Sequence, residues 1–372
     1  MLSFWEKNSF LNYDYIIIGS GILGLSCACS IKEKNLSASV LILEKGIFPE
    51  GASTKNAGFA CCGSLTEILS DFERIGEANT ISLVEKRWEG INLLRKRLGD
   101  DKIGFLNYGG YELIGSKHSA SSDKLKYVND RLGNIFKEDT FEIRNDKIKE
   151  FGFNEQIVES LVYSKFESQI DTGKMMGSLI EYAAGQGIKI INGCEVENIS
   201  EKQNYVKVIT KNYSGKERVD FCGKKIIICT NAFTKKIIPS MKIIPGRGHV
   251  IVTKPIKGLK FKGVFHFDEG FYYFRNFENR VIFGGGRNLD FKKEETEEIE
   301  SNEKIIKDLE YKLKTMILTE QKFEIDYSWS GIMGFTENKL PMIENISDRI
   351  ISVISCNGIG VALASYMANG IV

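Results

Sequence analysis

Three glycines near the start of the chain have the spacing of a phosphate-binding turn. Gly19, Gly21 and Gly24 form the pattern G-x-G-x-x-G between the apolar run 13–18 and an apolar stretch of helical character. In this setting the first glycine permits a tight turn, the second lets the backbone approach a pyrophosphate, and the third allows close packing of helix on strand. The N-terminus of the helix would then face the phosphates. The pattern predicts a strand, turn and helix that bind a dinucleotide.

An acidic residue ends the next apolar run. Glu44 follows the run 40–43 and lies about 20 residues after Gly24, the usual distance in such folds. A carboxylate here can accept hydrogen bonds from the ribose hydroxyls of an adenosine, and it disfavours a 2′-phosphate. The residues alone therefore favour FAD or NAD over NADP. A glycine-rich turn without a ligand is the structural alternative.

A loop of small and hydroxylated residues follows. Its sequence at 51–58 is Gly-Ala-Ser-Thr-Lys-Asn-Ala-Gly, which is too polar and too small to build a core. Such a loop suits the wrapping of a phosphate-bearing ligand. An ordinary surface loop is the alternative interpretation.

The composition limits the class of protein. The 372 residues suit two domains, and 50 Lys and Arg residues nearly balance 49 Asp and Glu residues, so nothing indicates a nucleic-acid partner. No apolar run approaches the length of a membrane span, and no signal peptide precedes the glycines, so we expect a cytoplasmic protein. The cysteines lack the spacing of zinc ligands, and we expect no metal. The oligomeric state and any role of the adjacent Cys61 and Cys62 stay open.

The apolar periodicity predicts the elements that position these residues. The charged run 292–300 is interpreted as a solvated loop that begins a helix to about residue 318. The other expected elements are amphipathic helices in 64–100, a hairpin in 104–115, a turn and helix from 116, a helix from Asp171 to Gly187, strands at 188–191, 205–210 and 224–229, and a mostly antiparallel sheet at 246–252, 264–268, 270–276 and 280–283.

Five separated motifs together resemble one family, the D-amino-acid oxidase-like FAD-dependent oxidoreductases, which include glycine oxidase and sarcosine oxidase. The motifs lie at 18–24, 51–58, 245–249, 270–275 with 284–286, and 329–336 leading to 357–361. The resemblance implies an α/β fold with a Rossmann-like FAD-binding domain assembled from discontinuous segments. A mostly antiparallel β-sheet domain with helices would cover the substrate. We place the FAD-binding domain at 1–80, 146–235 and 330–372, and the substrate domain at 81–145 and 236–329.

The resemblance also implies the reaction. A hydride would leave the carbon that bears the nitrogen of an amine or amino acid and pass to flavin N5, and water would hydrolyse the imine product. A flavin dehydrogenase of a hydroxy acid or polyol with an acceptor other than oxygen is an alternative, and a flavoprotein without turnover is another. The expected FAD contacts are Gly19, Gly21, Ile22, Leu23, Gly24, Glu44, Lys45, Ser53, Thr54, Lys55, Asn56, Ala57, Gly58, Val196, Thr230, Asn231, Gly331, Met333, Gly358, Ile359, Gly360 and Val361.

The chain departs from its better understood relatives at the substrate. Where glycine oxidase-like members carry an arginine for the substrate carboxylate, this chain has Met333, and a second cationic position is Cys356. A guanidinium is the usual means of holding a carboxylate in a dry pocket. A plain amino acid therefore requires a charge from elsewhere. The candidates are Arg275, Arg247, Lys55 and Arg287.

Two further departures concern the flavin. Sarcosine oxidase-like members place an oxygen-activating lysine where this chain has Ile282, so an acceptor other than oxygen becomes credible. Their covalent flavin cysteine aligns at or near Met333, so we expect noncovalent FAD.

The candidates for the substrate face are Tyr273, Arg275 and Met333. Tyr273 and Arg275 should share a face of one strand, because alternate residues point to the same side. A local role within the sheet is the alternative for each. His249 and His266 could act as bases, although a lone histidine in a strand is more often structural.

Overall fold

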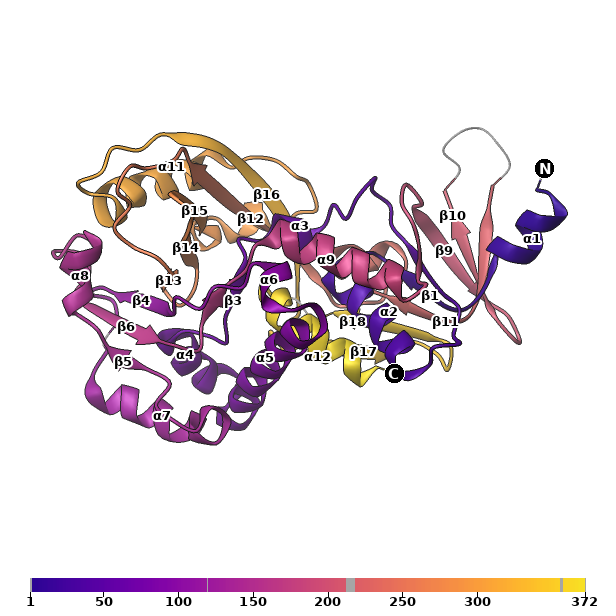
Figure 1. Cartoon of the computed structure of the whole chain (residues 1–372), viewed down its shortest axis with the longest axis horizontal. Helices are drawn as coiled ribbons and strands as arrows, with labels where there is room; N and C mark the ends of the chain where they lie inside the picture. The colour runs from indigo at the N-terminus through magenta and orange to yellow at the C-terminus, as the bar shows by residue number, and fades with distance from the viewer. Residues whose placement is uncertain (1, 119, 212–217, 355–356, 372) are drawn as a thin grey trace.

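Two eight-stranded sheets lie side by side along the long axis of the molecule (Figure 1). The computed structural model describes residues 2–118, 120–211, 218–354 and 357–371. The expected fold class is confirmed: one sheet is parallel at its centre and flanked by helices, and the other is mostly antiparallel.

The first sheet is built around strand β1. Its last three residues, Ile16–Ile18, are buried, which agrees with their unbroken apolar sequence at the centre of the sheet. It pairs in parallel with β2 and β11, and β11 pairs in parallel with β18. The strand order is β17 (Met342–Asn345), β18 (Ile350–Ile354), β11 (Asp220–Ile228), β1 (Asn12–Ile18), β2 (Val40–Leu43) and β8 (Lys189–Ile191), and β10 (Val206–Thr210) with β9 (Val196–Glu201) extends from β11.

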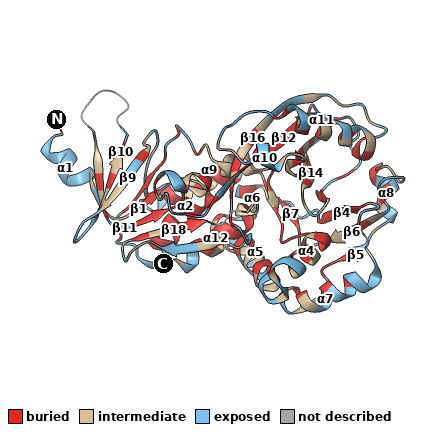
Figure 2. Cartoon of the chain, turned by 180° about the vertical axis from the view of Figure 1, so that it is seen from behind, coloured by how far each residue is buried: buried red, intermediate tan, exposed pale blue. Residues whose placement is uncertain are grey.

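Helices cover one face of the first sheet, and the β9–β10 pair packs against the other. The helical face forms a large apolar core that joins α2 (Ile22–Lys34), α5 (Glu77–Leu98), α9 (Thr172–Gly185) and α12 (Gly360–Gly370). A smaller core on the opposite face includes Ile16, Ile18 and Val206. Helix α2 is buried along most of its length, which agrees with a sequence of apolar and small residues from Ile22 to Ile31 (Figure 2).

The second sheet has an aromatic core on one face. Phe261, Phe265, Phe274 and Phe283 are fully buried there, against α11 (Glu303–Lys312) and η3 (Leu313–Ile317). The other face turns toward the first sheet and its helices. The strand order is β16 (Ile325–Phe335), β12 (Ile244–Thr253), β15 (Arg280–Gly285), β14 (Tyr272–Phe277), β13 (Val264–Phe267), β4 (Gly110–Ile114), β6 (Ser160–Ser164) and β5 (Glu142–Ile143).

Short elements connect these layers. They are α1 (Phe4–Phe10), α3 (Ala52–Lys55), β3 (Phe59–Ala60), α4 (Leu65–Ile75), α6 (Asp100–Ile103), α7 (Ser122–Phe136), α8 (Asp146–Phe151), β7 (Ser168–Gln169), η1 (Asn231–Lys236), η2 (Arg287–Leu289) and α10 (Phe291–Glu294). None of the helices in the described residues is long and apolar enough to cross a membrane.

Most expected elements are present, and two expectations are wrong. The hairpin in 104–115 is a single strand, β4, because its neighbours are the distant strands β13 and β6. The charged run 292–300 is not solvated throughout, since the side chain of Glu294 is 0% exposed. Its carboxylate has buried cationic partners, which a local charge pattern cannot reveal.

The expected domain boundaries stay a prediction, and the pairing of elements differs from them in three places. The first is β16, whose residues 330–335 belong to the second sheet although 330–372 is placed in the FAD-binding domain. Strand β6 joins the second sheet, although 146–235 was assigned to the FAD-binding domain. Helix α5 lies in the core beside the first sheet, although 81–145 was assigned to the substrate domain.

Candidate dinucleotide and substrate site

The glycine-rich turn has the geometry that its sequence predicts. Gly19 has φ of 101°, and a Cβ there would lie 2.9 Å from the carbonyl oxygen of Cys229. A Cβ on Gly24 would overlap the carbonyl oxygen of Gly19. Both positions therefore require glycine, one for its backbone conformation and the other for close packing of α2 on β1.

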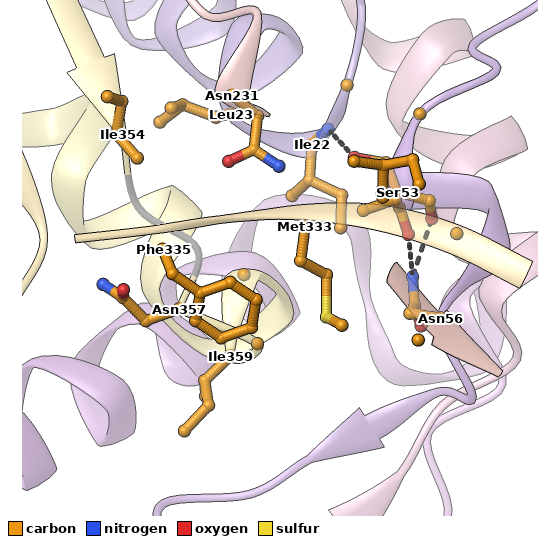
Figure 3. Close-up of a pocket in the computed structure, with 18 of the residues that line it drawn as sticks. Ile22, Leu23, Ser53, Asn56, Asn231, Met333, Phe335, Ile354, Asn357 and Ile359 are labelled. Atoms are coloured by element: carbon orange, nitrogen blue, oxygen red, sulfur yellow. Dashed lines mark hydrogen bonds between the residues drawn. The ribbon is translucent and has the colours of Figure 1, made fainter. Parts of the chain in front are cut away.

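The first turn of α2 is open to a ligand. Its N-cap residue, Gly21, offers no side chain to the free amides. The Oγ of Ser53, on α3, accepts a hydrogen bond of 2.9 Å from the amide of Ile22 (Figure 3). The Nδ2 of Asn56 donates to the carbonyl oxygen of Ser53 at 2.7 Å, which fixes this loop beside the turn. Two helix N-termini thus meet where the sequence predicts phosphate groups.

Glu44 is held in place by three donors. One carboxylate oxygen accepts from the amide and the hydroxyl of Ser20 at 2.9 and 2.8 Å, and the other accepts from the amide of Gly46 at 2.9 Å. The side chain is buried but lines the cavity described below. Because a carboxylate has about four acceptor sites, this one retains capacity for a ribose hydroxyl.

One cavity of about 680 Å³ runs from this turn to the second sheet, a size typical of cofactor sites. Gly24, Thr54 and Gly58 do not line it, and their contacts with a ligand, like those of the lining residues, stay predictions. The predicted FAD contacts that line it are Gly19, Gly21, Ile22, Leu23, Glu44, Lys45, Ser53, Lys55, Asn56, Ala57, Val196, Thr230, Asn231, Gly331, Met333, Gly358, Ile359, Gly360 and Val361.

Two features show that the cavity fits a polar dinucleotide. Asn231 has a left-handed backbone with φ of 50°, and its buried Oδ1 has no hydrogen-bond partner. Such an orphaned acceptor at a cavity wall suits a ligand donor. At the opposite wall α12 begins at Gly360 after Ile359, again without a capping side chain. The dipole of this helix favours negative charge at that point.

The predicted substrate face is partly present. Tyr273 and Met333 line the cavity, on β14 and β16. They meet above Gly248, where an added Cβ would lie 2.8 Å from the Cε of Met333 and 4.0 Å from the Tyr273 hydroxyl. Figure 3 shows Met333 and Phe335 on the same side of their strand. Burial raises the pKa of Tyr273 to about 12, so this phenol keeps its proton.

Arg275 has a different place from the one expected. It points to the same side of β14 as Tyr273, but it does not line the cavity. Its Nη1 donates to the carbonyl oxygens of Ile170 at 2.7 Å and of Gly58 at 3.3 Å. Burial lowers its pKa to about 10. Arg275 therefore links the second sheet to the loop that ends at Gly58, and its expected contact with a substrate stays a prediction that its place outside the cavity wall does not support.

The other candidate cations differ in whether they line the cavity. Arg247 is buried and pairs with Glu294, so it is unavailable to a substrate. Lys55 and Arg287 line the cavity. Cys356 lies outside the described residues. Ile282 is not part of the cavity wall and pairs with Arg275 across the two strands.

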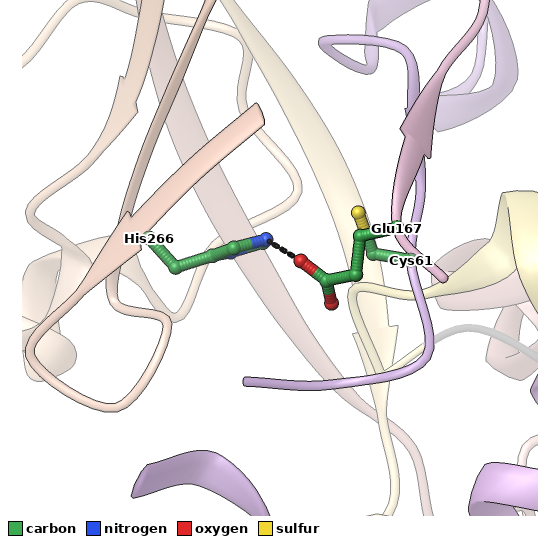
Figure 4. Close-up of side chains that lie close together, drawn as sticks. All are labelled: Cys61, Glu167 and His266. Carbon is green, nitrogen blue, oxygen red and sulfur yellow. Dashed lines mark ion pairs between the residues drawn. The ribbon is translucent and has the colours of Figure 1, made fainter. Parts of the chain in front are cut away.

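Cys61, Glu167 and His266 form a buried cluster that sequence reasoning found only in part (Figure 4). The Nε2 of His266 lies 3.1 Å from Glu167, and the ligand atoms of all three residues lie within 4.8 Å of one another. His266 and Cys61 also line the cavity. No sequence pattern indicates Glu167, because it lies in a short segment before β7 with no motif around it.

Charge and burial compete in this cluster. Burial lowers the pKa of His266, but the charge of Glu167 outweighs it, so the pKa is above its ordinary value. Burial raises the pKa of Glu167, and His266 more than reverses this. The result is an ion pair. Burial holds the pKa of the Cys61 thiol well above its usual range, so Cys61 keeps its proton.

Comparisons with known proteins agree with this site. A family model described as FAD dependent oxidoreductase matches residues 14–372. The probable oxidoreductase OrdL of Haemophilus influenzae is 23% identical over 94% of this chain and 80% of its own length. A D-amino acid dehydrogenase of Helicobacter pylori is 23% identical over 66% of this chain and 67% of its own length.

Solved structures share the fold. L-proline dehydrogenase from P. horikoshii superposes with a TM-score of 0.77 at 15% identity, covering 96% of this chain and 91% of that one. Glycine oxidase from Geobacillus kaustophilus gives a TM-score of 0.72 at 18% identity, covering 96% and 93% of the two chains.

Proposed function

The chain belongs to the family of FAD-dependent oxidoreductases, and we propose that it oxidises the carbon–nitrogen bond of an amine or amino acid. When bound, FAD would supply the acceptor for the hydride that leaves the carbon bearing the nitrogen. Water would then hydrolyse the imine. The protein's own groups orient the substrate and set the charge around it.

Two groups at the cavity wall, His266 and Tyr273, support the choice of an amine. An alcohol must give up its hydroxyl proton as it is oxidised, which requires a general base beside it. A neutral amine can lose a hydride without that step. Of the three histidines, all within the described residues, His266 alone lines the cavity, and its ion pair with Glu167 raises its pKa and so favours the protonated ring. Tyr273, with a pKa of about 12, also keeps its proton.

The relatives support the same choice. The matched Helicobacter protein is named as a D-amino acid dehydrogenase, and two structural neighbours as a proline dehydrogenase and a glycine oxidase. The proposal also includes noncovalent FAD, a cytoplasmic location and an acceptor other than oxygen, the last because Ile282 replaces the lysine of sarcosine oxidase-like members.

The test is anaerobic reduction of the purified flavoprotein. Glycine, D- and L-amino acids and simple amines are compared with the matching 2-hydroxy acids, and loss of the absorbance of oxidised flavin is followed. We expect amines or amino acids to bleach the flavin and hydroxy acids to leave it unchanged. Bleaching by hydroxy acids alone, or by no compound, contradicts the proposal.

Two smaller measurements complete the test. Acid precipitation should release all the FAD into solution, whereas flavin retained in the pellet would contradict noncovalent binding. The reduced protein should be reoxidised faster by a soluble quinone than by dissolved oxygen, and the reverse order would contradict an acceptor other than oxygen.

A further inference from the structure

Arg287 brings a positive charge to the cavity wall and forms no ion pair with the described residues, although the charges of Glu295 and Glu294 act on it from a distance. No hydrogen bond or ion pair joins its guanidinium to a described residue, and its buried Nε has no acceptor. The guanidinium instead stacks on Phe335 at 3.9 Å from the ring centroid and contacts Phe291 at 5.2 Å. Ring stacking orients the planar group but leaves its hydrogen-bond donors free.

The glycine at position 246 explains how Arg287 reaches this place. A Cβ on Gly246 would lie 2.9 Å from the Cζ of Arg287 and would overlap the ring of Phe335. Gly246 pairs across the sheet with Met333, the residue that stands where glycine oxidase-like members carry their carboxylate-binding arginine. The guanidinium therefore lies over the strand position beside Met333.

The backbone at Arg287 is fixed by the turn that joins β13 and β14. The amide of Gly286 donates to the carbonyl oxygen of Phe271 at 3.1 Å, and the side chain of Asn288 donates to Asp268 at 3.0 Å. Gly270 and Phe271 of the same turn line the cavity. Arg287 is thus held in position before a ligand arrives, which lowers the entropic cost of binding.

Three other cations of the cavity wall are less suited to a carboxylate. Arg87 donates to Glu67 at 3.0 Å and to the carbonyl oxygen of Cys62 at 2.8 Å. Lys339 lies near the carboxylates of Asp71 and Glu67. Lys55 packs its stem on Gly331 within the loop expected to contact the cofactor. Only a guanidinium offers two parallel donors to one carboxylate.

We propose that Arg287 binds the carboxylate of the substrate and replaces the arginine that is absent at position 333. The substrate class is then an amino acid rather than a simple amine. This inference rests on the proposed function, because it assigns a carboxylate to the substrate of the same cavity.

The experiment measures binding of carboxylates that cannot be oxidised. Benzoate and propionate are titrated into the FAD-loaded protein, with benzamide and propionamide as neutral controls, and the shift of the flavin absorbance reports binding. Wild-type protein is compared with Arg287→Met, Arg287→Lys and Gly246→Ala, the last of which displaces the guanidinium without removing it. Arg144→Met is the matched control, since Arg144 pairs with Asp146 away from the cavity.

The expected result is a selective loss of carboxylate binding. Arg287→Met should weaken benzoate binding at least about tenfold, the equivalent of one charge-assisted hydrogen bond, and leave benzamide binding unchanged. Arg287→Lys should retain part of the preference, Gly246→Ala should lose it, and Arg144→Met should match wild type. FAD content and the unfolding midpoint establish that each variant is folded.

Three outcomes overturn the inference. They are equal binding of benzoate and benzamide by wild type, equal benzoate binding by wild type and Arg287→Met, and loss of the preference in Lys55→Met but not in Arg287→Met. If no amine or amino acid bleaches the flavin, the proposed function fails, but the comparison of benzoate with benzamide still decides whether Arg287 binds carboxylates.

Discussion

His249 on β12 and His266 on β13 each lie beside one buried carboxylate of the second-sheet region. The Nε2 of His249 lies 2.7 Å from Glu294, and that of His266 lies 3.1 Å from Glu167. The first carboxylate also binds the guanidinium of Arg247 at 2.8 Å. The second has no arginine or lysine among its ion-pair partners in the described residues.

The two imidazoles hold their protons differently as a result. Burial lowers the pKa of both. For His249 the hydrogen bond to Glu294 opposes burial, but the charge of Arg247 helps keep the pKa below its ordinary value. The charges of Glu167, Glu67 and Glu112 all raise the pKa of His266, which lies above its ordinary value.

The difference shows that a third charged group beside a histidine–carboxylate pair decides which form of the histidine is favoured. The pair with Arg247 is closed off from the cavity and favours the neutral form of its histidine, which suits a structural role. The pair without an arginine favours the charged form of an imidazole at the cavity wall. Neither role follows from the histidine and the carboxylate alone.

The largest expected effect comes from breaking the closed pair. Glu294→Gln leaves the charge of Arg247 buried without a counter-charge, and Asn302, which donates to Glu294 at 2.6 Å, loses an anionic acceptor. We expect the free energy of unfolding to fall by about 3–5 kcal/mol, measured by urea denaturation. Glu324→Gln, which removes a surface partner of Lys254, should cost less than about 1 kcal/mol. Equal losses would contradict a buried role for Glu294.

The same carboxylate makes stability depend on pH. Burial raises its pKa, but the hydrogen bonds from Arg247, Asn302 and His249 lower it to about 2. A carboxylate with a lowered pKa stabilises the fold above its unfolded pKa, and this contribution is lost as pH falls. Wild type should therefore lose stability between about pH 5 and pH 2, and Glu294→Gln should lose less over that range.

The second prediction concerns the guanidinium of Arg247, the third charged group beside His249 and Glu294. Arg247→Met removes the cation that competes with His249 for Glu294, so the pKa of His249 should rise toward that of a simple ion pair. The chain has 3 histidines, so an NMR titration with labelled histidine can follow each ring. His266 should not move. Lys254→Met, which removes a surface cation of the same strand region, should leave all resonances unchanged.

The third prediction concerns the pair on the cavity. In Glu167→Gln the His266 ring stays buried but loses its main counter-charge. The pKa of His266 should therefore fall below its ordinary value. A histidine with a raised pKa stabilises the fold at low pH and loses this contribution as pH rises, and a lowered pKa has the opposite effect. Between about pH 6 and pH 8 the free energy of unfolding should therefore rise more, or fall less, with increasing pH in Glu167→Gln than in wild type. An unchanged His266 titration would show that Glu167 is not its counter-ion.

The smallest expected effect is on Cys61, the third member of that cluster. Because its pKa is raised well above the usual range, the thiol should stay protonated and react slowly with iodoacetamide. Native protein should show almost no labelling of Cys61 at mildly alkaline pH, whereas urea-unfolded protein should be labelled fully. Rapid native labelling would mean that the thiolate, and not Glu167, pairs with His266.

The sequence predicted the parts of the site whose partners are near in the chain. The turn at Gly19 to Gly24 and the carboxylate of Glu44 follow from short-range geometry, and the structure has them as expected. Asp171 likewise caps α9, accepting from the amide of Lys174 at 2.9 Å. Such features require only that a strand, turn and helix follow one another.

The parts that escaped prediction depend on distant partners. Arg275 binds the carbonyl oxygen of Gly58, 217 residues away, so its position in a β-strand motif did not show that its guanidinium was occupied. Glu294 looked solvated because its neighbours in the chain are charged, yet its partner Arg247 lies 47 residues earlier. Only the arrangement of the second sheet decides which charges meet, and no local pattern records that arrangement.

The order of strands in the first sheet has a consequence for synthesis. Strand β11 lies between β1 from the start of the chain and β18 from its end, and α12 packs on α2 and α5. The nucleotide-binding turn is therefore made before β18 and α12, and its sheet and helical cover close only when these two elements have emerged from the ribosome. Contacts of such long sequence separation slow folding. Cofactor insertion should accordingly follow synthesis of β18 and α12, and truncation before β18 should leave a polypeptide that does not retain FAD.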